Sequence, residues 1–306
     1  RQGKYKGKFT EGPEYENMWS LGAQCGNSNI GSIIYGEHLC DEYGLDAISA
    51  GNVIGFTMEC FEKGILSEKQ IGFPANFGND EAIIKFIEIM AKGKGIGELM
   101  SQGVRQMSKE LGKGAEKFAM HVKGMELPAY DPRGAFGMGL AYATSDRGAC
   151  HLRAWTLGAE VLDIQDRMDP FATEFKAELV KTQQDYFAVI QSAVVCLFLN
   201  FGLTQRQITR CIQSLTGIKE WKTTEDILKI GERIYNLTRL FSLREGISRK
   251  DDTLPERLLK EPVKEGPTKG VVVDLSTMLE EYYLVRHWDG EGRPTKEKLA
   301  ELGLEK

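Results

Sequence analysis

Cysteines are few in this sequence, and none of them stand close together. Six occur in 306 residues, without any Cys-x-x-Cys pair. A zinc or iron–sulfur site supplied by one segment needs closely spaced cysteines, and a disulfide framework needs a secretory context, so this spacing argues against both. The six are Cys25, Cys40, Cys60, Cys150, Cys196 and Cys211.

Long apolar runs and a strong excess of one charge are also missing. The longest apolar run, residues 187–201, contains Gln191, Ser192 and Asn200, which makes it too short and too polar for a membrane span. Lysine and arginine total 39 against 44 aspartates and glutamates, for a net charge of −5, and no long basic stretch is interleaved with aromatics. We therefore expect neither a membrane nor a nucleic acid as a partner.

The N-terminus lacks an initiator methionine and an apolar segment of signal-peptide type, because the chain begins Arg1-Gln2-Gly3. This start predicts a fragment of a cytoplasmic protein rather than a secreted product. What the sequence does have is a globular balance of 42% hydrophobic and 27% charged residues. A chain of this length and composition can bury a sizeable core, in one large or two modest domains.

Helical periodicity dominates the chain. Residues 80–90 place apolar side chains at helical spacing behind Asn79 or Asp80 as the N-cap. Sustained strand alternation is almost absent, and residues 270–273 are its main candidate. The sequence therefore predicts a mainly α fold. Further helices are expected over residues 96–111, 170–200, 204–215, 224–241, 275–285 and 295–302.

Loops are expected where glycine, proline and isolated charged residues gather. The expected loops cover residues 11–29, 124–153 and 244–269. A domain boundary is predicted near residues 119–121, just before the second of these loops. It divides the chain into two helical domains, residues 1–120 and residues 121–306.

Two glutamates flank an aromatic residue beside a Gly-Pro turn near the N-terminus. Glu14, Tyr15 and Glu16 directly follow Gly12-Pro13. A glutamate that is buried, with its pKa raised, could serve as a general base. Acidic residues are also common in the first turn of a helix, so the residues alone leave both interpretations open.

The segment Cys40-Asp41-Glu42-Tyr43-Gly44-Leu45-Asp46 is typical of a helix end. Gly44 can take the left-handed cap conformation, with Asp41 and Asp46 on either side of a tight turn. Carboxylates held in this way can accept hydrogen bonds from a planar donor edge such as that of a pterin. Ordinary solvent-exposed turn chemistry accounts for the same residues.

Arginines, small residues and one histidine gather in the predicted loop after residue 130. Residues 131–134 are followed by residues 145–153, which contain Arg147, His151 and Arg153. Such a segment suits an anionic ligand, because arginine can grip a phosphate with two donors. The pKa range of histidine suits proton transfer or hydrogen bonding, although a lone histidine beside a cysteine is more often structural.

In order and separation, these segments together resemble the aldehyde ferredoxin oxidoreductase family. The similarity extends over essentially the whole chain, and it implies the two helical domains that follow the family's N-terminal β-rich domain, which we expect to be absent here. The segments that carry it are residues 12–16, 40–46, 123–126, 147–152, 244–246, 249–255, 282–283 and 288–290.

The resemblance implies a tungsten bis-molybdopterin cofactor, or tungstopterin, with a [4Fe-4S] cluster nearby. By analogy, the Asp41, Gly44, Leu45 and Asp46 turn is the first DxxGL(D/C) pterin-binding turn. Its counterpart is the segment 191–196, where the family expects an Asp, a Gly-Leu pair and the fourth cluster cysteine.

Only part of that second pattern is kept. Cys196 fits the cluster ligand, whereas Gln191 and Val195 stand where the family's pterin-binding residues are expected. Loss of the aspartate charge should weaken the grip on the second pterin. The other three cluster cysteines are expected upstream of Arg1. His287 is a further departure, because the family commonly has glycine there.

The activity implied by the resemblance is oxidation of an aldehyde, with water, to a carboxylic acid, with ferredoxin accepting the electrons. Glu16, or with less support Glu14, would be the base, and His151 would orient the carbonyl or oxo oxygen. Arg147 and Arg153 would contact pterin phosphate. We expect the isolated chain to be inactive, and a homodimer stays open.

Two rival interpretations remain at this stage. The tungsten subunit of a benzoyl-CoA reductase-like enzyme would share the motifs, and a Cys40 thiolate could then ligate tungsten, although a buried free cysteine at a helix end is commoner. A cofactor-free helical binding or scaffold module would explain Gln191 and the missing domain.

Overall fold

The computed structural model describes residues 4–8, 10–164 and 167–305. Packing divides these residues into two units, each treated by itself below. The N-terminal unit extends to Tyr130 and includes Pro255–Arg257; the C-terminal unit comprises Asp131–Leu254 and the chain from Leu258 onward. The family-domain boundary predicted near residues 119–121 is a different kind of division and stays a prediction.

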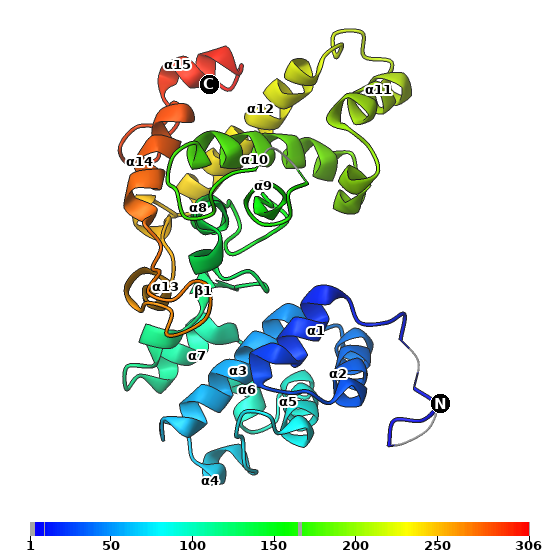
Figure 1. Cartoon of the computed structure of the whole chain (residues 1–306), viewed down its shortest axis with the longest axis vertical. Coiled ribbons are helices and arrows are strands. Elements are labelled where there is room, and N and C mark those ends of the chain that lie inside the picture. The colour runs from blue at the N-terminus through cyan, green and yellow to red at the C-terminus, as the bar shows by residue number, and fades with distance from the viewer. Residues whose placement is uncertain (1–3, 9, 165–166, 306) are drawn as a thin grey trace. The chain divides into compact units, whose positions relative to one another are not determined.

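The N-terminal unit is built on α3, with α1 packed along it (Figure 1). Gly51 on α3 permits this close approach, because a Cβ there would overlap the Ser20 carbonyl of α1. The helices are α1 Tyr15–Leu21, α2 Ile30–Tyr43, α3 Ala47–Glu62, α4 Glu68–Ile71, α5 Asp80–Ala91, α6 Ile96–Met100 and α7 Gly103–Leu111, followed by the antiparallel strands β1 His121–Val122 and β2 Met125–Glu126.

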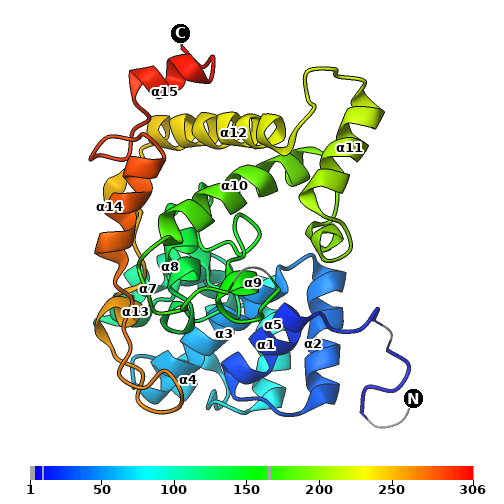
Figure 2. The same ribbon diagram turned by 45° about the horizontal axis from the view of Figure 1, so that its top comes forward.

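The C-terminal unit is organised around α10, which lies beside α12 and contacts α8 and α14 (Figure 2). The apolar residues Tyr186, Phe187, Ile190 and Ile208 form a small buried cluster between α10 and α11. The helices are α8 Phe136–Thr144, α9 Leu157–Glu160, α10 Lys176–Ser192, α11 Gln205–Thr216, α12 Thr224–Arg244, α14 Leu275–Val285 and α15 Lys296–Glu301, and η4 Leu197–Phe201 is a 3-10 helix. The short helix α13, Glu256–Lys260, is divided by this assignment, because its first two residues are counted with the N-terminal unit.

The contact between α10 and α12 depends on Gly231. We expect Gly231→Ala to lower the free energy of unfolding by about 1–3 kcal/mol or more, because the added Cβ would overlap the Asp185 carbonyl on α10. Gly202→Ala is the matched control, since a Cβ there has only Leu199 O, 3.9 Å away, within 4 Å. Urea unfolding of both variants tests this prediction, and equal stability would contradict it.

Most predicted helices are confirmed, with changes at their ends. The helix over residues 275–285 coincides with α14, and Asn79 caps α5 by accepting a hydrogen bond from the Ala82 amide. The predicted helix 96–111 is two helices, because Gly103 takes a positive φ of 81° between them. The predicted helix 170–200 begins only at Lys176 and ends at Ser192. No described helix is long and apolar enough to cross a membrane.

The expected strand and the three expected loops were wrong. Residues 270–273 form no strand. Gly270 N donates to Val263 O and Val263 N donates to Val271 O, but Val273 N donates to Leu258 O of α13, so the pairing with Val263 does not continue as a ladder. The expected loop 124–153 contains α8. All nine residues of α8 are buried, so it has no polar face and shows no amphipathic period. The expected loop 11–29 likewise contains α1, and the expected loop 244–269 contains α13.

Candidate functional site

The first predicted turn joins α2 to α3 and has the expected left-handed glycine. Gly44 has φ 67° and donates its N–H to the Asp41 carbonyl, while the Leu45 amide donates to Cys40 O at 2.8 Å. Asp46 caps α3, because its Oδ1 accepts from the Ser49 amide at 2.7 Å. The Asp41 side chain is exposed at this turn. The turn therefore presents one carboxylate to solvent on a fixed backbone.

The end of α10 repeats this backbone turn with different side chains. Val194 has φ 58°, its amide donates to Gln191 O at 3.1 Å, and the Val195 amide donates to Ile190 O at 3.4 Å. These are the same two hydrogen bonds that close the turn at Gly44. A β-branched residue in the left-handed region costs about 1–2 kcal/mol, so Val194 has a strained conformation that these two hydrogen bonds accompany.

Glu16 is the buried glutamate of the N-terminal pair. It lies in the first turn of α1, with 7% of its surface exposed, and its Oε2 accepts from the Ala129 amide at 2.9 Å. Burial raises the pKa of Glu16, although hydrogen bonds from Ala129 and the Tyr130 side chain oppose the shift. Glu14, in contrast, is exposed. Both features expected from the sequence, the first-turn position and the buried carboxyl group, therefore apply to Glu16.

Glu126 is the residue of segment 123–126 whose side chain has a clear structural role, which the sequence did not predict. Its Oε1 accepts from the Val104 amide at the start of α7 at 2.8 Å, and its Oε2 accepts from Ser49 Oγ at 2.9 Å. Ser49 is the residue whose amide Asp46 caps. Glu126 therefore ties the first turn to α7. Gly103 leaves room for this carboxylate, since a Cβ there would lie 2.9 Å from Oε1.

The segment that carries His151 follows α8. Arg153 pairs with Asp146, with Nε 2.8 Å from Oδ1, whereas Arg147 is exposed and His151 half-buried. Gln191 at the end of α10 donates its amide to the Leu152 carbonyl. The structure thus brings the second turn and the His151 segment together within the C-terminal unit. Glu14, Glu16 and the Asp41–Asp46 turn all belong to the N-terminal unit.

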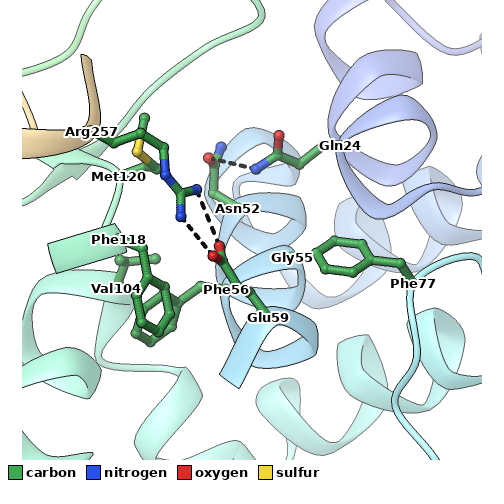
Figure 3. Close-up of a pocket in the computed structure, with 10 residues that line it drawn as sticks. All are labelled: Gln24, Asn52, Gly55, Phe56, Glu59, Phe77, Val104, Phe118, Met120 and Arg257. Carbon is green, nitrogen blue, oxygen red and sulfur yellow. Dashed lines mark hydrogen bonds and ion pairs between the residues drawn. The ribbon is translucent and has the colours of Figure 1, made fainter. Parts of the chain in front are cut away.

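A pocket of about 130 Å³ lies in the N-terminal unit, and none of the predicted site residues lines it (Figure 3). Glu59 and Arg257 form a bidentate ion pair in its wall, at 2.6 and 3.2 Å, and Gln24 donates to Asn52 Oδ1 at 3.2 Å. These polar groups already satisfy one another. The remaining lining residues are Gly55, Phe56, Phe77, Val104, Phe118 and Met120.

Comparison with known proteins identifies the family. A family profile described as "Aldehyde ferredoxin oxidoreductase, domains 2 & 3" matches residues 1–304. The chain belongs to the aldehyde ferredoxin oxidoreductase family. The predicted family and mainly helical fold class are thereby confirmed.

Several relatives within this family are similar over nearly the whole chain. Tungsten-containing aldehyde ferredoxin oxidoreductase of Pyrococcus furiosus is 44% identical over 300 residues, covering 96% of this chain and 49% of that protein. The protein of the same name from Pyrococcus horikoshii is 45% identical over 303 residues, covering 97% and 49%. The aliphatic sulfonate oxidoreductase, WOR-like subunit, of Pyrococcus furiosus is 30% identical over 320 residues, covering 99% and 47%. The chain therefore spans about half the length of these relatives.

Among solved structures, the chain is similar to the active site complex BamBC of benzoyl coenzyme A reductase. The TM-score is 0.75 at 23% identity, with 97% of this chain and 50% of that chain covered. A likeness at this identity establishes the fold alone.

Two residues at which the resemblance implies glycine have a left-handed backbone. Val194 and His287 have φ angles of 58° and 53°. Both angles lie in the region that favours glycine.

The family's cofactors fit this chain unequally. The Gly44 turn, with its exposed Asp41 carboxylate, suits a pterin donor edge. At the second turn the Gln191 amide already donates to Leu152 O, which leaves its oxygen as the acceptor. Among the described residues, no three His, Cys, Asp or Glu side chains lie close enough to hold a metal ion. Cys196 is exposed and could supply only one cluster ligand.

Cys40 lies buried near the end of α2. Burial, with smaller contributions from Asp41, Asp46 and Glu37, raises the pKa of its thiol to about 12 when no metal is bound. A bound metal lowers the pKa of a thiol, so tungsten ligation by Cys40, the feature of the benzoyl-CoA reductase-like alternative, stays a prediction.

Proposed function

We propose that this chain forms the helical part of a tungsten-pterin enzyme that oxidises aldehydes to carboxylic acids. An aldehyde and water would give the acid, two protons and two electrons, with ferredoxin as the electron acceptor. The observation that carries this proposal is the pair of turns, at Gly44 and Val194, with one left-handed backbone geometry. The proposal that the metal is tungsten and the substrate an aldehyde is based on the names of the relatives.

In this proposal the first turn holds one pterin, and a bound tungstopterin supplies the two-electron redox chemistry. The Asp41 carboxylate accepts from the pterin's donor edge, with Gly44, Leu45 and Asp46 fixing the backbone around it. At the second turn Gln191 and Val195 take the corresponding places. Because Gln191 is uncharged, its hydrogen bond to the second pterin is weaker than that of Asp41 to the first.

Glu16 is the proposed base. Its buried carboxylate is held by the Ala129 amide, and its raised pKa brings it closer to the pH at which it must take a proton from water or from a hydrated aldehyde. His151 donates a hydrogen bond to the reacting oxygen. Arg147 is available to a pterin phosphate, whereas Arg153 would share its guanidinium with Asp146.

Further polypeptide is a proposed partner. Cys196 would be the fourth ligand of a [4Fe-4S] cluster whose other cysteines come from the family's N-terminal domain. The apolar residues around Cys196 support this contact, since Val194, Phe198 and Phe201 are 90%, 67% and 56% exposed. Solvent-exposed apolar side chains gathered in one short segment mark a surface that another part of a protein covers.

The test is metal content and turnover of the protein expressed from its complete gene and purified without oxygen. We expect tungsten, iron and aldehyde-dependent reduction of ferredoxin. Asp41→Ala should lower tungsten occupancy about 10- to 100-fold, because a charge-assisted hydrogen bond is lost. Glu42→Ala, an exposed neighbour, should retain the metal. Absence of tungsten from the unsubstituted protein would contradict the proposal. If the protein contains tungsten but does not turn over aldehydes, aldehydes are excluded as its substrates.

A further inference from the structure

The segment between α8 and α9 has no regular structure, yet it is anchored at both ends. The His151 segment is defined here as residues 144–155, from Thr144, the last residue of α8, to Trp155, and it includes Asp146 and Arg153. A loop that carries a functional side chain needs supports of its own to hold that side chain in one orientation. In the C-terminal unit these supports come from α10 and α12.

The start of the His151 segment is held by two buried hydrogen bonds. The Tyr235 hydroxyl of α12 donates to the Thr144 carbonyl at 2.8 Å. The Gln184 amide of α10 donates to Thr144 Oγ1 at 3.0 Å. Thr144 is the last residue of α8, where helix carbonyls lack partners within the helix.

The end of the segment is held by two more glutamines of α10. Gln183 Oε1 accepts from the Trp155 amide at 2.7 Å, and the Gln191 amide donates to the Leu152 carbonyl. Three glutamines of one helix thus reach both ends of the segment. His151 lies directly before the residue that Gln191 holds.

Gln184, the most buried of the three glutamines, is itself held by two hydrogen bonds. Gln184 Oε1 accepts from the Tyr282 hydroxyl at 2.5 Å and from Arg286 Nη2 at 2.7 Å, both on or next to α14. Its oxygen is therefore committed, and its amide hydrogens are the groups that face Thr144. Exchanging the oxygen and nitrogen of Gln184 would break these contacts.

We propose that α10 and α12 position His151 through a clamp formed by Gln183, Gln184, Gln191 and Tyr235. The catalytic role of His151 rests on the proposed function, but the clamp does not. Gln191 gives the clamp a feature particular to this chain. The aspartate expected at its place could not donate to the Leu152 carbonyl, whereas the glutamine amide does.

The experiment compares two clamp variants with a matched control. Tyr235→Phe and Gln191→Met each remove a donor to the segment, and Gln191→Lys restores one. Tyr186→Phe is the control, because it also removes one hydroxyl hydrogen bond in this unit, 2.7 Å to Asn200 Oδ1, without touching the segment. The readout is the rate at which diethyl pyrocarbonate modifies His151, mapped by mass spectrometry. Half-buried His38 in the other unit serves as the internal reference.

We expect Tyr235→Phe and Gln191→Met to raise the ratio of His151 to His38 modification about fivefold, as loss of one hydrogen bond implies. Tyr186→Phe should leave the ratio unchanged, and Gln191→Lys should restore it. Unchanged ratios in both clamp variants would refute the clamp, as would an equal rise in Tyr186→Phe. Aldehyde turnover is a separate readout, expected to fall about ten- to a hundredfold in kcat with little change in KM. If the ratio of His151 to His38 modification rises while turnover stays complete, the clamp is supported and His151 has no part in the proposed reaction.

Discussion

Replacing Arg286 with methionine should lower the free energy of unfolding of the C-terminal unit by about 3–5 kcal/mol. The Arg286 side chain is completely buried, and its Nη1 lies 2.5 Å from Asp185 Oδ1. Its Nε donates to the Tyr282 hydroxyl at 2.9 Å, and its guanidinium lies 4.3 Å from the centre of the Tyr235 ring. Methionine fills a similar volume but leaves a buried carboxylate without its main partner.

The control for Arg286 separates the buried charge from the loss of a long side chain. Arg244→Met removes an arginine whose ion pair with Glu245 is largely exposed, so it should change the free energy of unfolding by less than about 1 kcal/mol. The double variant Arg286→Met with Asp185→Leu should recover part of the loss, because no unpaired charge then stays buried. Chemical denaturation measures all three. A single variant as stable as Arg244→Met would show that Lys181, 2.9 Å from Asp185, compensates the charge alone.

Replacing Glu16 with glutamine in the protein from the complete gene should lower kcat by about 10²- to 10⁴-fold. The fold should tolerate the change, because the glutamine oxygen can still accept from the Ala129 amide. The ionised base is present only above its pKa, and burial raises that pKa. Turnover should therefore rise with pH through a value above the ordinary glutamate range, and this acid limb should vanish in Glu16→Gln. A steady-state pH profile measures both effects.

Glu14→Gln is the matched control for Glu16, since Glu14 lies two residues away and is exposed. It should keep both turnover and the acid limb. Loss of the limb in Glu14→Gln instead would transfer the role of base to Glu14. Full turnover in both variants would exclude a glutamate base at this helix and would leave the buried carboxyl group with a structural role only.

Local sequence signals predicted the elements whose cause is local. The apolar period and an asparagine cap define α5, and a glycine after α2 predicts the left-handed turn at Gly44. The same rules fail at Val194, because valine disfavours the left-handed conformation that this turn nevertheless has. α8 was not predicted because it is buried on every side and therefore has no amphipathic period.

The sequence by itself determined the helical class through periodicity and caps, which are properties of neighbouring residues. The resemblance of its motifs to a known family indicated the aldehyde ferredoxin oxidoreductase family and the candidate site residues. Only the tertiary structure decided which of two glutamates is buried and which groups Glu126 holds. It also decided that three glutamines of α10 reach the His151 segment. These outcomes depend on hydrogen bonds between residues 22 to 113 positions apart, such as Glu126 with Val104 and Glu16 with Ala129. The fold must be formed before such partners can meet.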